Sequence, residues 1–392
     1  MKIPFVDLHA QYLTIKHEID RAIAEVIAQS AYIRGPHVDA FEGAWARTLG
    51  VKRCVSCANG TDAIYITLRG LGLKRGDEVI TSAHSWISTS ETITQAGGRV
   101  VFCDTDEETF TIDPIEIERK ITPATVGIVP VHLYGQAADM AAIMAIAREH
   151  NLWVLEDCAQ AHLAKYNGRY VGTFGNAGTF SFYPGKNLGA YGDAGCVVTN
   201  DDRLADWLAT FARHGGKGDH IMEGINSRMD GLQAAILNAK LPHLPAWTQA
   251  RRLVAALYCE LLQDVGDVIT PEVGSNRDHV YHLYVIRTEN RDALREHLSQ
   301  AGISTVLNYP KALPFYPAYA YLGHVPKDFP AAYFNQSRIL SLPIYPEMPA
   351  EAITHVVNVI SHFWSSESPK VIELTPANLI GIEHRTPVLS DN

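Results

Sequence analysis

Apolar residues near the start of the chain recur with the spacing of an amphipathic helix. Between residues 13 and 29 they recur at helical spacing, at Leu13, Ile19, Ile23, Val26 and Ile27. This spacing places them on one face of a helix, so the sequence predicts an opening helix over this range. The following tract, SAYIRGPHV, contains glycine and proline and predicts the end of the helix.

From about residue 50, short apolar runs alternate with helical patterns. The runs read EVITSA, RVVFCD, VGIVPVH, LWVLED, GTFSF and GCVVTN. Uninterrupted apolar runs of this length are typical of buried parallel strands. The segments TDAIYITLRGLGL and ADMAAIMAIAREH have the length and period of crossover helices. The alternation predicts an α/β fold with helices on both faces of a mostly parallel sheet.

A different pattern begins after the proline-marked segment LPHLPAW. A helix (RRLVAALYCELLQ), a strand (HLYVIRT), a helix (RDALREHLSQAG) and a proline-rich loop near residues 308 to 330 follow in order. We therefore expect a large domain at residues 1–245 and a smaller C-terminal α+β domain at 246–365. Residues 366–392 lack a clear period and are interpreted as a C-terminal tail.

Composition narrows the classes of function. The 392 residues carry a formal net charge of -10, which argues against general binding to nucleic acid or anionic membrane, since both need a broad positive surface. The N-terminus lacks a charged stretch followed by an apolar core, and no apolar run approaches the roughly 20 residues that span a bilayer. The expected location is cytoplasmic.

Cysteine and histidine patterns predict no metal site. The six cysteines are too few for a disulfide scaffold. Cys54 and Cys57 have a CxxC spacing, but no second pair completes a tetrahedral site. His279 and His282 lie on the predicted strand HLYVIRT or directly before it, where their odd spacing points them to opposite faces. We interpret both pairs as structural.

The most informative stretch is GTFSFYPGKNLGAYGDAGCVVTND, in which a strand runs into a glycine-rich loop. Lys186 is the single lysine of this loop. A lone loop lysine is usually a solvated surface charge, but a buried lysine with a lowered pKa becomes a nucleophile that forms imines with aldehydes.

Two further elements carry polar groups at strand ends. Asp157 ends the strand in LWVLEDCAQAH, where open α/β sheets bind ligands, although Asp also caps helices. A carboxylate there could pair with the pyridine nitrogen of pyridoxal phosphate. In CANGTDAIYITL, Gly60 and Thr61 begin a helix whose free N–H groups attract phosphate, and the same letters also make an ordinary capped helix start.

Taken together, these elements resemble the DegT/DnrJ/EryC1/StrS sugar aminotransferases, which have the type I fold of pyridoxal-phosphate-dependent transferases. The segments that match the family pattern, in the expected order, are IPFVDLHAQY, NGTDA, EDCAQAH, FSFYPGKNLGAYGDAG, GINSRMDGLQAAIL and SLPIYPEM. They span about residues 3 to 360. The resemblance therefore covers most of the chain.

The resemblance implies a role for each matched residue. Lys186 would bind the cofactor as a Schiff base and act as general base, Asp157 would pair with the pyridinium nitrogen, and Gln160 would bind the ring hydroxyl. The phosphate would be held by Gly60, Thr61 and Ser181, together with Asn226 from the other subunit of a homodimer with shared sites. Trp86 would stack on the cofactor ring, with a core tryptophan as the alternative.

The same resemblance implies the reaction. An amino group would move from L-glutamate to a nucleotide-linked keto-deoxysugar, most plausibly to C-3 of a dTDP-3-keto-6-deoxyhexose, with C-4 amination as the alternative. Tyr183, Asn308 and Tyr309 are the candidate sugar contacts. The diphosphate would be met by a basic residue, for which the candidates are Arg228, Lys217 and Arg34, each of which has surface charge as its alternative.

Three positions depart from the family pattern, and two other functions compete. Trp86 replaces a smaller aromatic, Leu163 stands where glycine is commoner, and Asn308 stands where histidine often precedes the tyrosine. One rival function is a sugar dehydratase of the same fold, whose members replace the anchoring lysine with histidine. The other is a non-catalytic regulatory relative, which a missing lysine or aspartate would reveal. Lys186 and Asp157 argue against both.

Overall fold

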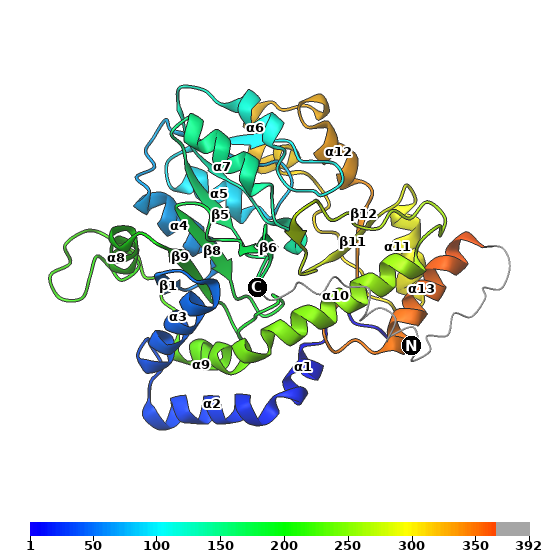
Figure 1. Cartoon of the computed structure of the whole chain (residues 1–392), viewed down its shortest axis with the longest axis horizontal. Helices are drawn as coiled ribbons and strands as arrows, with labels where there is room; N and C mark the ends of the chain where they lie inside the picture. The colour runs from blue at the N-terminus through cyan, green and yellow to red at the C-terminus, as the bar shows by residue number, and fades with distance from the viewer. Residues whose placement is uncertain (366–392) are drawn as a thin grey trace.

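A seven-stranded sheet forms the centre of the computed structural model, which describes residues 1–365 (Figure 1). Its strand order is β3-β2-β4-β5-β8-β9-β1. The strands are β1 (Arg53–Cys57), β2 (Glu78–Ser82), β3 (Arg99–Cys103), β4 (Thr125–Val129), β5 (Trp153–Asp157), β8 (Ala177–Ser181) and β9 (Gly195–Thr199).

Six of these strands run in the same direction. The pairs β2–β3, β2–β4, β4–β5 and β5–β8 are parallel, whereas β9 is antiparallel to both of its neighbours, β8 and β1. The predicted mostly parallel sheet is therefore confirmed. The carboxyl ends of all six strands meet at one edge of the sheet, which is where ligands bind in such folds.

Helices cover both faces of the sheet, because successive strand residues point to opposite sides. In β5, Val154 packs into one apolar core and Leu155 into the other. The first core receives α3 (Pro36–Leu49), α6 (Pro114–Lys120), α7 (Met140–Glu149) and α9 (Gly231–Lys240). The second receives α4 (Gly60–Gly70), α5 (Ser88–Gln95) and α8 (Asp202–Phe211).

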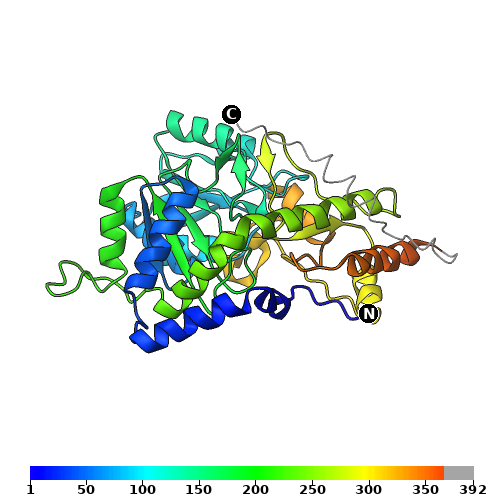
Figure 2. The same ribbon diagram turned by 60° about the horizontal axis from the view of Figure 1, so that its bottom comes forward.

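The opening segment forms two helices rather than the single predicted one. These are α1 (Leu8–Thr14) and α2 (Lys16–Gln29), and α2 ends at Ser30, whose φ of 51° is left-handed. Ile15 and Ile19 pack with Ile236 of α9 and Trp247. This contact places α2 alongside α9, as Figure 2 shows.

The second half of the chain builds another apolar core around the long helix α10 (Leu244–Leu261). Its other members come from β11 (Tyr284–Arg287), β12 (Ile339–Leu342), α11 (Arg291–Gln300) and α13 (Ala350–Trp364). Ile3 joins the same core and forms a parallel bridge with Ile303, so the chain begins within this part (Figure 1). The division into domains at residue 245 stays a prediction.

The proline-rich segment contains short helices that pack away from that core. These are η3 (Leu313–Phe315), η4 (Pro317–Leu322), η5 (Pro326–Asp328) and α12 (Pro330–Gln336). Leu313, Tyr319 and Phe329 lie in the second core of the central sheet. The segment thus connects the two halves of the molecule. Smaller elements are β6 (Lys165–Tyr166), β7 (Arg169–Tyr170), β10 (Arg277–Asp278), η1 (Leu133–Gly135) and η2 (Leu241–His243).

The predicted C-terminal tail, residues 366–392, lies outside the described residues. Among the helices of residues 1–365, none has both the length and the apolar character that a membrane span requires.

Candidate active site

A cavity of about 670 Å³ opens at the carboxyl edge of the sheet. Most of the residues proposed from the sequence line it, namely Gly60, Thr61, Trp86, Asp157, Gln160, Ser181, Tyr183, Lys186, Asn308 and Tyr309. Asn226 and Arg228 do not line it. The fold therefore gathers residues from several separate loops into one site.

The loop that carries Lys186 is fixed at several points. It leaves β8 after Ser181, and Phe182 N–H donates to the carbonyl of Ala194, which precedes β9. The buried Asn187 donates from Nδ2 to the carbonyl of Val280 at 3.1 Å. Lys240 donates to the Gly189 carbonyl at 2.7 Å. These bonds set the direction in which the lysine enters the cavity.

Burial changes the acid–base properties of Lys186. Removal from water lowers the pKa of its amine to about 8, and the negative charge of Asp157 partly opposes the shift. A larger fraction of the amine is therefore unprotonated near neutral pH than for an exposed lysine. An unprotonated amine is what imine formation and proton abstraction require.

Asp157 ends β5 and faces the same cavity. Its Oδ2 accepts a hydrogen bond from the Thr89 hydroxyl at 2.7 Å, and its Oδ1 accepts one from Ala159 N–H at 3.1 Å. Each carboxylate oxygen can accept two hydrogen bonds, so acceptor capacity remains for a ligand.

Gln160 links the two sides of the cavity. Its Oε1 accepts from the Tyr134 N–H at 2.7 Å, and its Nε2 donates to the hydroxyl of Tyr309 at 2.9 Å. Tyr309 is held again through its backbone N–H, which donates to Nε2 of the buried His84 at 3.0 Å. Burial lowers the pKa of His84 to about 4, so its ring is neutral and can accept this bond. The Trp86 and Tyr309 rings lie 5.5 Å apart.

At the other end of the cavity, the start of α4 approaches the end of β8 closely. A Cβ added at Gly60 would lie 2.6 Å from the Cβ of Ser181, so only glycine fits there. Asn59 caps the helix by accepting from Asp62 N–H at 2.8 Å. The Thr61 and Ser88 hydroxyls lie 2.7 Å apart. First-turn N–H groups and three hydroxyls thus converge, as in sites that bind phosphate.

The segment that contains Asn226 docks beside this helix without entering the cavity. Ser227 donates to Oδ2 of Asp62 at 2.7 Å and accepts from Ala58 N–H at 3.1 Å. Asn226 itself is exposed, and Arg228 is half-buried.

The two other candidate cations also lie outside the cavity. Arg34 lies 3.4 Å from Glu42 in an ion pair, and Lys217 is exposed on a loop.

Two cavity residues were missed or misplaced by the sequence patterns. The strand expected around His282 begins only at Tyr284, so the period-two interpretation of His279 and His282 is wrong. His282 lines the cavity, and its Nδ1 lies 3.3 Å from Oδ1 of Asn187. Arg251, which the sequence analysis did not single out, also lines the cavity. Neither position had a local signal that could identify it.

A scan of known families matches residues 13–361 to the DegT/DnrJ/EryC1/StrS aminotransferase family. The chain belongs to this family. Its members depend on pyridoxal phosphate, so the predicted enzyme class and cofactor are confirmed.

Several known proteins align with this aminotransferase over nearly its whole length. A pleiotropic regulatory protein of Geobacillus stearothermophilus is 46% identical over 93% of this chain and 99% of its own length. A dTDP-3-amino-3,4,6-trideoxy-alpha-D-glucose transaminase of Streptomyces venezuelae is 40% identical over 92% and 95%. The crystal structure of S. venezuelae DesV in complex with a ketimine intermediate superposes with a TM-score of 0.91 and 38% identity, over 93% and 99%, which confirms the type I fold.

One departure from the family pattern has a backbone explanation. Leu163 has a φ of 65°, in the left-handed region that glycine adopts without strain. Glycine is therefore the residue that this turn favours. The leucine side chain is buried in the first core of the sheet, where its apolar contacts offset part of the backbone cost.

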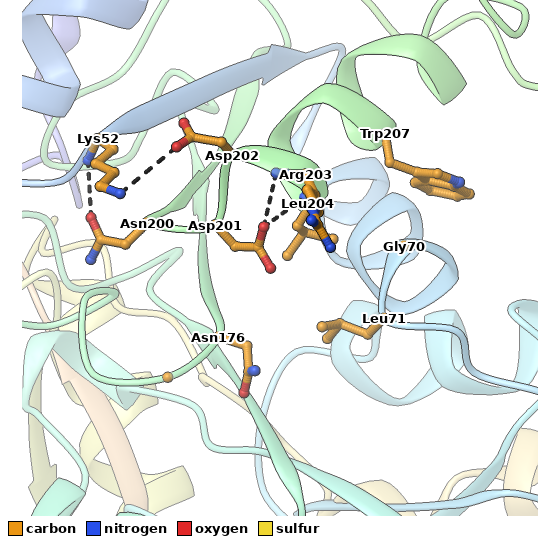
Figure 3. A pocket seen from close by; sticks show the side chains of 11 residues that line it. Lys52, Gly70, Leu71, Asn176, Asn200, Asp201, Asp202, Arg203, Leu204 and Trp207 are labelled. Carbon is orange, nitrogen blue, oxygen red and sulfur yellow. Dashed lines mark hydrogen bonds and ion pairs between the residues drawn. The ribbon is translucent and has the colours of Figure 1, made fainter.

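A larger hollow, of about 930 Å³, does not include Lys186 among its lining residues, and Figure 3 shows the side chains around it. It is lined by residues at the opposite sheet edge, such as Asn176, which precedes β8, and Asn200, which follows β9. Its polar groups bond to one another: Lys52 N–H donates to Asn200, and Lys52 Nζ lies 3.7 Å from Asp202. We assign no function to it.

A buried acid directly before Asp157 stabilises the end of β5. Each carboxylate oxygen of Glu156 accepts two hydrogen bonds. Oε1 accepts from the N–H groups of Phe174 and Gly175 at 2.7 and 2.8 Å. Oε2 accepts from Gly172 N–H at 2.7 Å and from Nε2 of His132 at 3.0 Å. His132, Glu156 and Cys158 have the composition of a metal site. However, the carboxylate has no lone pair left for a metal ion.

We predict that Glu156→Gln lowers the free energy of unfolding by about 3–5 kcal/mol, because the new amide group would face buried donors. Urea unfolding of the holoprotein measures the change. Glu149→Gln, at an exposed position on α7, is the control and should shift the value by less than about 0.5 kcal/mol. Equal effects of the two substitutions would contradict the assignment.

We also predict that Lys186 titrates near pH 8 in the cofactor-free protein. Reductive methylation with ¹³C-formaldehyde and a pH series of NMR spectra measure this, and Lys186→Arg should remove the signal. Burial lowers the pKa of Lys240 to about 8 as well, so Lys240→Arg is the matched control that must leave the Lys186 signal in place. A Lys186 signal that titrates above pH 10 would contradict the prediction.

Proposed function

We propose that the enzyme transfers an amino group from L-glutamate to C-3 of a dTDP-linked 3-keto-6-deoxyhexose. The observation that carries the chemistry is that Lys186, with its lowered pKa, and Asp157 line the same cavity. The nature of the substrate is supported by the 40% identical transaminase, whose name specifies a dTDP-3-amino sugar. Amination at C-4 is the competing reaction.

The residues of the cavity fit pyridoxal phosphate. Asp157 retains acceptor capacity for a protonated ring nitrogen, and Gln160 has a second N–H beyond the one that it gives to Tyr309. Gly60, Thr61 and Ser181 present N–H and hydroxyl groups suited to the phosphate, and Trp86 can stack on the ring. When bound, the cofactor supplies an electron sink that stabilises a carbanion at the donor's α-carbon.

Lys186 has two tasks in this proposal. Its amine would hold the cofactor through the aldehyde carbon, and, when free, it would act as the base that carries a proton from and to the donor's α-carbon. Its lowered pKa favours both tasks, because each requires the unprotonated amine. Tyr183, Asn308 and Tyr309 line the cavity at positions suited to sugar hydroxyl groups.

Asn226 and Arg228 would act from the second subunit of a homodimer. Asn226 is exposed, and neither residue enters the cavity of its own chain. The Asp62–Ser227 bond nevertheless places their segment beside the site. In a dimer, Asn226 would therefore contact the cofactor phosphate in the site of the other subunit, and Arg228 would contact the diphosphate of the substrate bound there.

The reaction is tested by incubating the holoenzyme with glutamate and, separately, with dTDP-3-keto, dTDP-4-keto and UDP-3-keto sugars. Mass spectrometry should detect the 3-amino product from the dTDP-3-keto sugar. Lys186→Ala should lower turnover by about 10³-fold or more, since it removes both the anchor and the base. An amino product from the 4-keto sugar alone would refute the position, and full activity of Lys186→Ala would refute the mechanism.

Sharing of the site between subunits is tested by mixing Lys186→Ala with Asn226→Ala chains. A mixed dimer would contain one site with both substitutions and one with neither. Random exchange of subunits should then restore about a quarter of wild-type activity from two inactive parents. Parents that stay inactive after exchange, verified by native mass spectrometry, would contradict the shared site.

A further inference from the structure

Arg251 is a buried cation in the wall of the active-site cavity. It lies on α10, and only 4% of its surface is exposed. Its Nη1 donates to the backbone carbonyls of Ile344 at 2.9 Å and Tyr281 at 3.2 Å. These two bonds fix the plane of the guanidinium group and use both hydrogens of Nη1.

The other edge of this guanidinium group has no partner within residues 1–365. Nε is buried without a hydrogen bond, and Nη2 forms none. The Nε–H and one Nη2–H of arginine form a fork that matches the two oxygens of a carboxylate. A buried charge without a hydrogen-bonded counterion costs free energy, and burial lowers the pKa of Arg251 to about 10 even though the charge of Glu347 partly opposes the shift. The group nevertheless stays charged at neutral pH.

The charge of Glu347 acts on Arg251 and partly opposes the lowering of its pKa, but the two side chains are not directly paired. No ion pair within 4.0 Å joins Glu347 to Arg251 in the described part of the chain, and both carboxylate oxygens of Glu347 are buried without hydrogen bonds. Burial raises the pKa of Glu347, which favours its neutral form. Thus, among the described residues, neither side chain has a directly bonded partner of opposite charge.

Among the charged side chains that line the cavity, Arg251 is the cation that remains available to bind an anion. Four carboxylate, amine or guanidinium side chains line the described cavity: Asp157, Lys186, Asp193 and Arg251. Lys186 is occupied by its bond to the cofactor in the proposed function. The hydroxyls and helix N-terminus suited to phosphate belong to α4, α5 and β8, whereas Arg251 is anchored to the segments at Tyr281 and Ile344.

We propose that Arg251 binds a carboxylate of the amino donor through its Nε and Nη2 edge. The inference rests on the proposed function, because it assigns the binding of the anionic donor in that reaction. Val6, Leu283 and Ile344 line the same cavity and supply apolar surface for the methylene groups of glutamate. The carboxylate would supply the counterion that the buried guanidinium group lacks.

The test uses the holoenzyme and glutarate, which carries the two carboxylates of glutamate but has no amine and cannot react. Isothermal titration calorimetry should show that Arg251→Lys weakens glutarate binding about tenfold or more, because lysine keeps the charge but loses the fork. The KM for glutamate should rise by a similar factor. The KM for the acceptor sugar should change less than about twofold.

Glu347→Gln is the matched control. It removes a nearby acid without touching the fork, so glutarate should bind as tightly as to wild type or more tightly. If Arg251 instead serves the packing of the two halves, both variants should weaken glutarate and acceptor alike and lower the melting temperature together, which would overturn the proposal. Glutarate binding by Arg251→Lys within twofold of wild type would also overturn it.

Failure of the proposed function is distinguishable from failure of this inference. Wild-type enzyme that accepts the amino group of glutamate, seen as loss of its visible absorbance, but aminates none of the sugars would refute the proposed acceptor. The Arg251 measurements would still decide the donor site, because glutarate binding and the glutamate half-reaction need no sugar.

Discussion

The site depends on one constraint, the common direction of six strands in the central sheet. Because their carboxyl ends lie at one edge, Asp157 at the end of β5 and Lys186 after the end of β8 come together although they are distant in the chain. The antiparallel strand β9 adds a second effect. It returns the chain beside β8, so the loop with Lys186 is closed at both ends by the sheet.

Burial acts on three basic groups of the site, with a different outcome for each. The pKa of Lys186 falls to about 8, which makes part of its amine available as a base. The pKa of His84 falls to about 4, so the ring is neutral and accepts the Tyr309 N–H. The pKa of Arg251 falls only to about 10, so the guanidinium group keeps its charge at neutral pH. The intrinsic basicity of each group therefore decides whether burial creates a base, an acceptor or an anion site.

Six strands of the central sheet, the lysine loop and the end of β5 could be predicted from the sequence, because buried strands and glycine-rich loops have local signatures. The edge strand β1, which has the mixed sequence RCVSC, was not among the predicted strands. Arg251 could not, since its partners are carbonyls near residues 281 and 344, and no local pattern reveals such contacts. His282 was assigned to a strand because the apolar run continues past it. In the structure, the preceding Tyr281 has a φ of 44°, which interrupts the extended backbone.

The two walls of the cavity are stabilised in different ways. On the sheet side, the four hydrogen bonds of Glu156 fix the backbone on which Asp157 stands. The second half of the chain supplies Arg251 and Tyr309 to the other wall, and Tyr309 is hydrogen-bonded to Gln160 and His84 of the first half. A ligand that bonds to Gln160 and Arg251 at once would contact both walls. The relative placement of the two halves of the chain therefore sets the shape of the cavity, because each half supplies part of its lining.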